Sequence, residues 1–342
     1  MNISNADKTV LVTGGSGFVG SWVIIALLQR GYTVRATIRN LSRESSARYS
    51  IAKQIDAGDR LSFFAADLLG DAGWDLAING SDFIIHVASP MPTGEYKKTD
   101  VVRPAREGTL RVLKAGIRAG VQRVVLTSSL QAALPSITYN GVPDETVWSD
   151  LSSKNTQDYT RAKTLAEQDA WAVMRQQNSS TTLTAILPGM IQGPILGTDY
   201  SGSVDLIARL LKGKIPRYPR IGFSIIDVRD LADLHVRAME SAEAAGQRFV
   251  AASDFLWLGE IAHILRERFG ARAAKVPTQA LPDFVVRLLA YVSADLRFIA
   301  PNLGKRTDFT SAKAVRTLGW HARPAIDAIV DAAESLIREG LV

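Results

Sequence analysis

Two motifs about 140 residues apart contain the residues of this chain that could do chemistry. The first is a glycine-rich turn from Thr13 to Gly20, and the second places Tyr159 and Lys163 four residues apart. Glycines at this spacing let a backbone approach phosphate oxygens, and a helix that follows them offers unpaired N–H groups to the phosphates. On a helix, residues four apart share one face, so a phenol and an ammonium would meet. Together the motifs predict a redox enzyme that binds a dinucleotide.

The glycine turn lies between a predicted strand and a predicted helix, and this is the context in which such a motif binds a pyrophosphate. Its glycines fit both common spacings of the motif. The alternative is a tight strand-to-helix turn that binds no ligand. The residues predicted to contact the phosphates are Gly14, Gly17, Phe18 and Val19.

The residues after the second predicted strand indicate which dinucleotide is bound. Arg39 lies 19 residues after Gly20, where an NAD-binding chain usually carries an acid for the ribose 2′-hydroxyl. A guanidinium can fork onto a 2′-phosphate, and Arg43 is close enough to assist, so NADP(H) is favoured. Alternatively, both arginines are ordinary surface residues. Asp67 ends the third predicted strand beside the expected adenine site, although it could equally be a turn or cap residue.

The catalytic hypothesis rests on three side chains. A free phenol with a pKa of about 10 exchanges protons poorly at neutral pH. Beside Tyr159, the Lys163 ammonium and an oxidised nicotinamide both favour the phenolate, so Tyr159 could act as acid in reduction and as base in the reverse direction. Ser129 follows the fifth predicted strand, at the sheet edge where ligands bind, and would hydrogen-bond the substrate oxygen. Each feature alone is more often structural; their order along the chain favours catalysis.

Composition excludes several other classes of protein. The 40 Lys and Arg residues are scattered among 34 Asp and Glu, so no nucleic-acid partner is expected. With no Cys and four scattered His, no metal site is predicted. The N-terminus lacks the layout of a signal peptide, and no apolar stretch is long enough to span a membrane. We therefore expect a soluble, cytoplasmic monomer or homodimer without a membrane partner.

The elements that must position these residues alternate between short β-branched runs and longer amphipathic segments. Their repeated β-α-β order requires right-handed crossovers and a parallel sheet whose faces are both buried. The predicted fold class is therefore α/β, a doubly wound parallel sheet of the Rossmann type. The predicted strands lie at residues 9–13, 33–38, 61–65, 83–88, 123–127 and 182–187, and the helices between them at 18–30, 99–119 and 157–176.

The pattern changes after Pro188, where Gly and Pro become frequent up to Gly222. Strands at 223–228 and 248–252, with a helix at 231–244, are expected to return to the main sheet, and the chain from about Leu258 is mostly helical. The prediction is an NADP-binding Rossmann domain of residues 1–188 plus about 223–252, and a smaller, mostly helical, discontinuous substrate domain of about 189–222 plus 253–342.

The ordered set of motifs resembles the extended short-chain dehydrogenases/reductases, specifically the branch of dihydroflavonol reductases and yeast-type NADPH carbonyl reductases. The resemblance implies that Ser129, Tyr159 and Lys163 form the catalytic triad and that Arg39 contacts the 2′-phosphate. The matching segments are Thr13–Gly20, Val34–Arg39, Ala66–Leu68, His86–Met91, Leu126–Ser129, Tyr159–Lys163, Leu187–Pro194 and Leu318–Trp320.

The resemblance implies further cofactor contacts. The cofactor's ribose and phosphates would be lined by Val87, Ala88 and Ser89. The nicotinamide would be held by Pro188, Met190 and Ile191. The predicted cofactor set is completed by Leu68, Thr127 and Lys163, which lie in the matching motifs.

Departures from the family pattern bear on the substrate. Leu134 stands where dihydroflavonol reductases place an Asn that grips the flavonoid, so flavonoid reduction is not expected. Ala105 stands where many extended members carry an Asn for proton relay. Together with Met91 and Leu130, Leu134 predicts a pocket for a hydrophobic ketone or aldehyde, although each of these residues could equally belong to the core.

Three functions remain open at this point. The first is reversible, NADPH-dependent reduction of an apolar, aromatic or bulky ketone or aldehyde to an alcohol. The second is a nucleotide-sugar epimerase or dehydratase of the same superfamily; the basic stretch Lys212–Arg220 could embrace a diphosphate, but Arg39 favours a diffusible NADP, and Leu130 replaces the acid of dehydratases. The third is a non-catalytic, NADP-sensing binding protein, which the intact triad disfavours.

Overall fold

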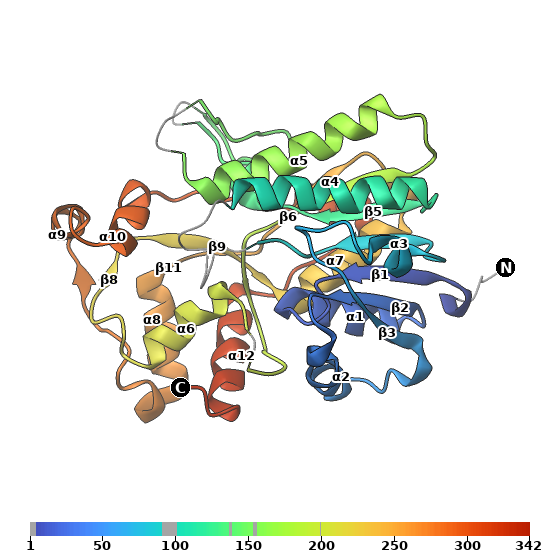
Figure 1. Ribbon diagram of the computed structural model, residues 1–342. Coiled ribbons are helices and arrows are strands. Elements are labelled where there is room, and N and C mark those ends of the chain that lie inside the picture. The colour runs from blue at the N-terminus through green and yellow to red at the C-terminus, as the bar shows by residue number, and fades with distance from the viewer. Residues whose placement is uncertain (1–4, 91–100, 137–138, 153–155, 199) are drawn as a thin grey trace. The chain divides into compact units, whose positions relative to one another are not determined.

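The computed structural model describes residues 5–90, 101–136, 139–152, 156–198 and 200–342 (Figure 1). Contacts divide the chain into two compact units. The first unit comprises Met1–Pro188, Arg229–Ala251 and Ser311–His321. The second unit comprises Gly189–Val228, Ala252–Thr310 and Ala322–Val342.

The first unit is built on a seven-stranded parallel sheet with the strand order β10-β6-β5-β4-β1-β2-β3. The doubly wound, Rossmann-type fold predicted from the sequence is confirmed. All but one of the predicted strands of this sheet lie within a residue of their expected bounds. The strands are β1 (Thr9–Thr13), β2 (Thr33–Ile38), β3 (Leu61–Ala65), β4 (Phe83–His86), β5 (Arg123–Thr127), β6 (Thr182–Pro188) and β10 (Arg248–Ala251).

Helices cover both faces of this sheet. Figure 1 shows α4 and α5 side by side over one face and α1 and α2 on the other. The middle of β1, Val10 to Val12, is fully buried, because its side chains pack against both layers. The helices of this unit are α1 (Phe18–Gln29), α2 (Glu44–Ala52), α3 (Trp74–Ile78), α4 (Val102–Arg118), α5 (Asp158–Gln176), α7 (Val228–Glu240) and α11 (Ala312–Leu318).

The second unit contains a three-stranded sheet in the order β11-β9-β7 and a two-stranded pair of β8 and β12. Its strands are β7 (Met190–Gln192), β8 (Tyr218–Pro219), β9 (Gly222–Asp227), β11 (Phe255–Trp257) and β12 (Ala280–Leu281). Its helices are α6 (Gly202–Leu211), α8 (Leu258–Phe269), α9 (Asp283–Leu289), α10 (Ala294–Ile299) and α12 (Ala325–Arg338).

The strand predicted at 223–228 was assigned to the wrong sheet. It forms β9, which pairs with β7 and β11 and not with the main sheet. A Cβ at Gly222 would lie 2.3 Å from the Phe255 ring, so the missing side chain lets the Phe255 side chain of β11 cover the start of β9. The strand predicted at 248–252, by contrast, joins the main sheet beside β6 as predicted.

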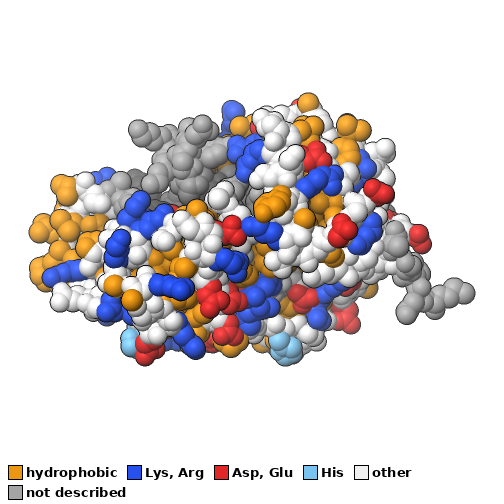
Figure 2. Space-filling view, turned by 90° about the horizontal axis from the view of Figure 1, so that it is seen from below, with side chains coloured by type: hydrophobic (Ala, Val, Ile, Leu, Met, Phe, Trp, Pro, Cys, Tyr) orange, Lys and Arg blue, Asp and Glu red, His pale blue; other side chains and the backbone are white. Residues whose placement is uncertain are grey.

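Charges of both signs are mixed over the surface. On the face shown in Figure 2, Lys and Arg side chains lie among Asp and Glu side chains and do not form one block. Exposed pairs such as Arg118 with Asp75 and Arg306 with Asp308 illustrate this mixing. In the part of the chain that the structure describes, no helix combines the length and the apolar character that crossing a membrane requires.

Two histidines are buried inside the first unit. His86 Nδ1 lies 2.8 Å from Thr13 Oγ1, and His235 Nε2 lies 2.8 Å from Thr127 Oγ1. Since His235 Nδ1 lies 2.7 Å from the Leu231 carbonyl, which only accepts, Nδ1 carries the proton and the Thr127 hydroxyl donates to Nε2. Burial, aided at His86 by the charge of Lys163, lowers the pKa of His86 to about 3, and burial lowers that of His235 to about 4.

Acid should therefore destabilise the fold well above these values. Below the ordinary histidine pKa of about 6.5, both histidines become protonated in the unfolded chain but stay neutral in the folded one. Each ring therefore lowers the free energy of unfolding by about 2 kcal/mol at pH 5. Urea unfolding at pH 7.5 and 5 measures this loss. In the variant His235→Gln the loss should shrink, whereas His263→Gln, at an exposed site, is the control. An unchanged pH dependence in His235→Gln would contradict the assignment.

Candidate active site

The glycine turn has the geometry of an anion cradle. β1 ends at Thr13, and α1 begins at Phe18 with Gly17 as its N-cap and without a side-chain cap. Gly14 has a φ of +73°, and a Cβ at Gly20 would lie 2.2 Å from the Gly14 carbonyl oxygen. The turn therefore requires glycine at both positions, and no side chain competes for the first N–H groups of α1. These features fit a dinucleotide pyrophosphate.

A single hydroxyl fixes the end of β4 against this turn. Thr13 Oγ1 accepts hydrogen bonds from the backbone N–H groups of Val87 at 3.1 Å and Ala88 at 3.0 Å. Because His86 is neutral, its Nδ1 can accept the Thr13 hydroxyl hydrogen. These bonds explain why β4 stops at His86, although the sequence predicts a strand to residue 88. A Cβ at Gly14 would lie 3.2 Å from the Ala88 Cα, so this segment lies directly against the glycine turn.

The residues predicted for the adenosine end lie at the carboxyl ends of β2 and β3. Arg39 is exposed directly after β2. The exposed Asp67 accepts a hydrogen bond from the backbone N–H of Leu69 at 2.9 Å, which is a local turn contact. Leu68 packs against Gly108 of α4, where a Cβ would lie 2.8 Å from the Leu68 Cβ. The cofactor contacts of these residues stay predictions.

The three predicted catalytic side chains gather where β5 ends and α5 begins. Ser129 is the N-cap of a short 3-10 helix, and its Oγ accepts from the backbone N–H of Gln131 at 3.2 Å. The Ser129 side chain also hydrogen-bonds Tyr159, the second residue of α5. Lys163 is buried one turn further along, and its Nζ donates to the Thr127 carbonyl at 3.1 Å. The carboxyl end of β5 is thus linked to both α5 residues.

The protonation of these groups is governed mainly by burial. Burial raises the pKa of Tyr159, and the hydrogen bond with Ser129 only partly opposes it. The sequence predicts a lowered pKa for Tyr159, whereas in the chain itself the pKa is raised. The reason is that removal of the phenol from water outweighs the hydrogen bond with Ser129. Burial also lowers the pKa of Lys163 to about 8, against the opposing charge of Glu167. At neutral pH the site therefore holds a protonated phenol and an ammonium.

The remaining predicted residues divide between the two units. Leu130 is buried next to Ser129, and the half-buried Leu134 donates its backbone N–H to Ser149 Oγ at 2.7 Å. Met91 lies outside the described residues. In the first unit, Ser89 follows β4 and Pro188 ends β6, while the half-buried Met190 and Ile191 belong to β7 of the second unit.

Sequence reasoning missed three buried groups beside the predicted triad, namely Ser128, Glu167 and Arg248. Glu167 lies one turn beyond Lys163 on the same face of α5, and this spacing was a signal that could have revealed it. Nothing in the local sequence marks Arg248, because it reaches the site only through the pairing of β10 with β6.

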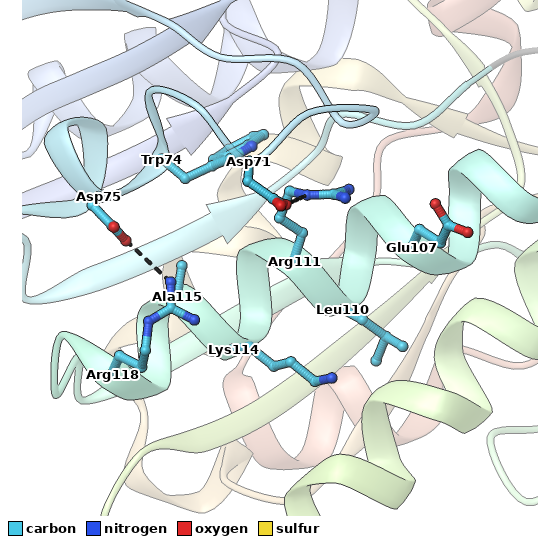
Figure 3. Close-up of a pocket in the computed structure, with 9 residues that line it drawn as sticks. All are labelled: Asp71, Trp74, Asp75, Glu107, Leu110, Arg111, Lys114, Ala115 and Arg118. Carbon is cyan, nitrogen blue, oxygen red and sulfur yellow. Dashed lines mark hydrogen bonds and ion pairs between the residues drawn. The ribbon is translucent and has the colours of Figure 1, made fainter.

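A cavity of about 490 Å³ lies elsewhere in the first unit, between α3 and α4 (Figure 3). Arg111 pairs there with Asp71, and Arg118 pairs with Asp75 at 3.1 Å. Cations and carboxylates are balanced along its wall, so the cavity favours neither sign of ligand charge. None of the predicted catalytic or cofactor residues lines it.

Comparison with known proteins places this chain in a family. Residues 10–252 match the NAD dependent epimerase/dehydratase family, and the chain belongs to it. It is 37% identical to cinnamoyl-CoA reductase 1 of Petunia hybrida over 270 residues, which cover 78% of this chain and 79% of that protein. It is 34% identical to dihydroflavonol 4-reductase of Zea mays over 269 residues, which cover 76% and 74%. The predicted resemblance to the dihydroflavonol reductase branch is confirmed.

Solved structures show the same fold. The yeast methylglyoxal/isovaleraldehyde reductase Gre2, crystallised with NADPH, superposes with a TM-score of 0.80, and the match covers 98% of this chain and all 100% of that one. At 22% sequence identity, this likeness is one of fold.

The glycine turn can be tested by adding one methyl group. In Gly20→Ala the new Cβ would meet the Gly14 carbonyl, so the turn must move, and NADPH should bind at least about tenfold more weakly. Fluorescence titration with NADPH measures the affinity. Gly70→Ala is the matched control, because a Cβ there meets nothing within 4 Å. Equal affinity of a folded Gly20→Ala variant and the parent chain would refute the role of the turn.

Proposed function

We propose that this chain is an NADPH-dependent reductase that reversibly converts an apolar, aromatic or bulky ketone or aldehyde into the alcohol. The observation that carries the proposal is the meeting of Ser129, Tyr159 and Lys163 at the carboxyl end of β5. Membership of a family of NAD dependent enzymes and the reductase names of the curated relatives support an oxidoreductase.

The cofactor is NADP(H), which supplies the hydride when it is bound. The glycine cradle fits its pyrophosphate, and the exposed Arg39 after β2 favours the form with a 2′-phosphate. Lys163 would contact the ribose. The other residues proposed to hold the cofactor are Gly14, Gly17, Phe18, Val19, Asp67, Leu68, Val87, Ala88, Ser89, Thr127, Pro188, Met190 and Ile191.

The chain's own residues orient the substrate and move the proton. Ser129 Oγ would donate a hydrogen bond to the carbonyl oxygen and hold it beside Tyr159. Because burial raises its pKa, Tyr159 is a protonated phenol at neutral pH and can deliver that proton to the oxygen as the alcohol forms. The Lys163 ammonium, directed by the Thr127 carbonyl, stabilises the phenolate left behind.

The substrate class is argued from apolar side chains next to the proposed proton donor. Leu130 is buried immediately after Ser129, and Leu134 stands where dihydroflavonol reductases carry an Asn. Ala105 is buried among Val101, Ala162 and neighbouring residues, so this position supplies packing and no proton relay. The curated relatives' names include an aromatic thioester and a flavonoid as substrates, which supports an aromatic compound in this site.

The basic stretch Lys212–Arg220 is the feature that bears on the alternative, a nucleotide-sugar enzyme. Arg220, at its end, is engaged by Asp283 at 2.6 Å and so is partly neutralised as a ligand for a diphosphate. We propose that the protein works in the cytoplasm as a monomer or homodimer on small molecules.

Oxidation of NADPH and NADH against a substrate panel tests the proposal. The panel holds aromatic ketones, bulky aldehydes, cinnamoyl-CoA, a dihydroflavonol and a nucleotide sugar. We expect steady, substrate-dependent loss of NADPH absorbance with an aromatic or bulky carbonyl, and slower loss with NADH. The reductase proposal would be overturned if no carbonyl compound caused loss of NADPH absorbance and the nucleotide sugar were converted without net use of cofactor. That outcome would support internal redox chemistry.

Replacing one phenol separates an enzyme from a cofactor sensor. Tyr159→Phe should reduce kcat about 10²- to 10⁴-fold, since it removes the proton donor, while NADPH affinity stays close to that of the parent. Tyr49→Phe, at an exposed position of α2, is the matched control and should keep full activity. Turnover of Tyr159→Phe at the parent rate would contradict the assigned role.

A further inference from the structure

A buried ionic network lies behind the proposed triad and takes no part in the mechanism above. Glu167 is fully buried on α5, one turn after Lys163. Its Oε1 accepts hydrogen bonds from Arg248 Nε at 2.6 Å and Trp171 Nε1 at 3.1 Å. Its Oε2 accepts from Arg248 Nη2 at 3.3 Å and from the Ser128 hydroxyl. All four lone-pair directions of the carboxylate are therefore used.

Arg248 is satisfied just as fully from its place on β10. Besides the two bonds to Glu167, Nη1 donates to the carbonyl oxygens of Glu145 at 2.6 Å and Val147 at 2.9 Å, and Nη2 donates to that of Ala132 at 3.3 Å. Its guanidinium lies 3.7 Å from the ring centroid of Trp148. Each of its five N–H donors thus has an acceptor, and the guanidinium is held rigidly.

Glu167 and Arg248 bind the two ends of the segment from Ser128 to Ala132, which carries Ser129. The Ser128 hydroxyl donates to Glu167 at one end, and the Ala132 carbonyl accepts from Arg248 at the other. Since Glu167 projects from α5, the helix of Tyr159, the network sets the Ser129 segment against the helix that bears the proton donor.

The charge of the network also reaches Lys163. Burial lowers the pKa of Lys163 to about 8, and the Glu167 carboxylate opposes this effect. The charge of Lys163 also acts on His86 of β4, which is neutral, and Tyr159 lies one turn before Lys163 on the same helix. A buried ion pair adds little stability compared with apolar side chains of the same size. The charge of Glu167 is therefore better explained by its effect on Lys163 than by stability.

We propose that Glu167, fixed in place by Arg248, is a positioning residue that sets the Ser129 segment against α5 and keeps Lys163 protonated where the cofactor binds. The inference rests on the proposed function, in which Lys163 binds the cofactor ribose. It assigns the network no contact with the substrate.

Glu167→Gln tests the role of the charge, because the amide keeps the shape and an acceptor for Ser128. The NADPH affinity of the parent should fall as pH rises through about 8, where Lys163 loses its proton. In Glu167→Gln, the midpoint of this fall should move about one pH unit lower. Fluorescence titration across pH measures it without turnover.

Glu145→Gln is the matched control. Glu145 is a buried carboxylate in the same region that accepts the Val250 backbone N–H at 2.8 Å and does not act on Lys163. Its variant should keep the parent midpoint, even if its melting temperature falls. If Glu167→Gln does not fold, the double variant Glu167→Gln with Arg248→Met removes both buried charges and should show the same lowered midpoint.

Ser128→Ala tests the positioning of the segment, because it removes the bond to Glu167 and leaves the charges unchanged. We expect kcat to fall about tenfold while the KM for NADPH and the pH midpoint stay at the parent values, and Ser128→Thr should restore kcat.

The outcomes separate this inference from the proposed function. A folded Glu167→Gln or double variant with the parent midpoint would overturn the inference, as would unchanged kcat in Ser128→Ala. A parent chain that binds NADPH but reduces no carbonyl would refute the reductase proposal, yet the midpoint shift could still support the role of Glu167. A parent chain that does not bind NADPH would overturn both.

Discussion

Because both faces of the seven-stranded sheet are buried, polar side chains can reach a ligand only at the ends of its strands. Because β1, β4 and β5 run parallel, their carboxyl ends reach one edge, and each ends in a Thr or His whose polar atoms are already engaged. The Thr13 hydroxyl accepts a hydrogen bond from the backbone that follows β4. The Thr127 carbonyl accepts one from Lys163, and the Thr127 hydroxyl donates one to His235. The edge is thus preorganised by hydroxyl groups that face inward, so the side chains beyond it remain available for a ligand.

Burial and a few specific partners keep the ionisable groups of this interior in defined charge states. His86 and His235 are neutral because burial lowers the pKa of both rings, and each ring accepts the hydroxyl hydrogen of a threonine. Lys163 and Arg248 stay charged beside one carboxylate, Glu167. The hydrogen bond from Lys163 Nζ to the Thr127 carbonyl gives the ammonium a fixed direction, which an exposed lysine would not have.

Much of the fold could be predicted from the sequence, since strands that are buried on both faces consist of unbroken apolar runs. The proximity of the three proposed catalytic residues could be predicted because Tyr159 and Lys163 share a helix face and Ser129 follows a strand. Pairing partners are less visible: the apolar run of β9 looked like the other strands, and its place beside β7 depends on contacts far apart in sequence. The early end of β4 was equally hidden, because the Thr13 hydroxyl replaces sheet hydrogen bonds. Arg248 was missed because it reaches Glu167 only through the pairing of β10 with β6, which is also a contact between segments far apart in sequence.

The late position of β10 in the chain has a consequence for folding. A nascent chain that has reached Pro188 already contains the glycine turn and all three proposed catalytic residues. The partner that neutralises Glu167 lies 81 residues beyond that carboxylate, after a segment that belongs to the second unit. A carboxylate buried without its cation is strongly unfavourable, so this interior should stay hydrated until β10 has been synthesised and its loop has closed. We therefore expect completion of the Glu167–Arg248 network to be a late step in folding, dependent on a strand that lies at the edge of the sheet.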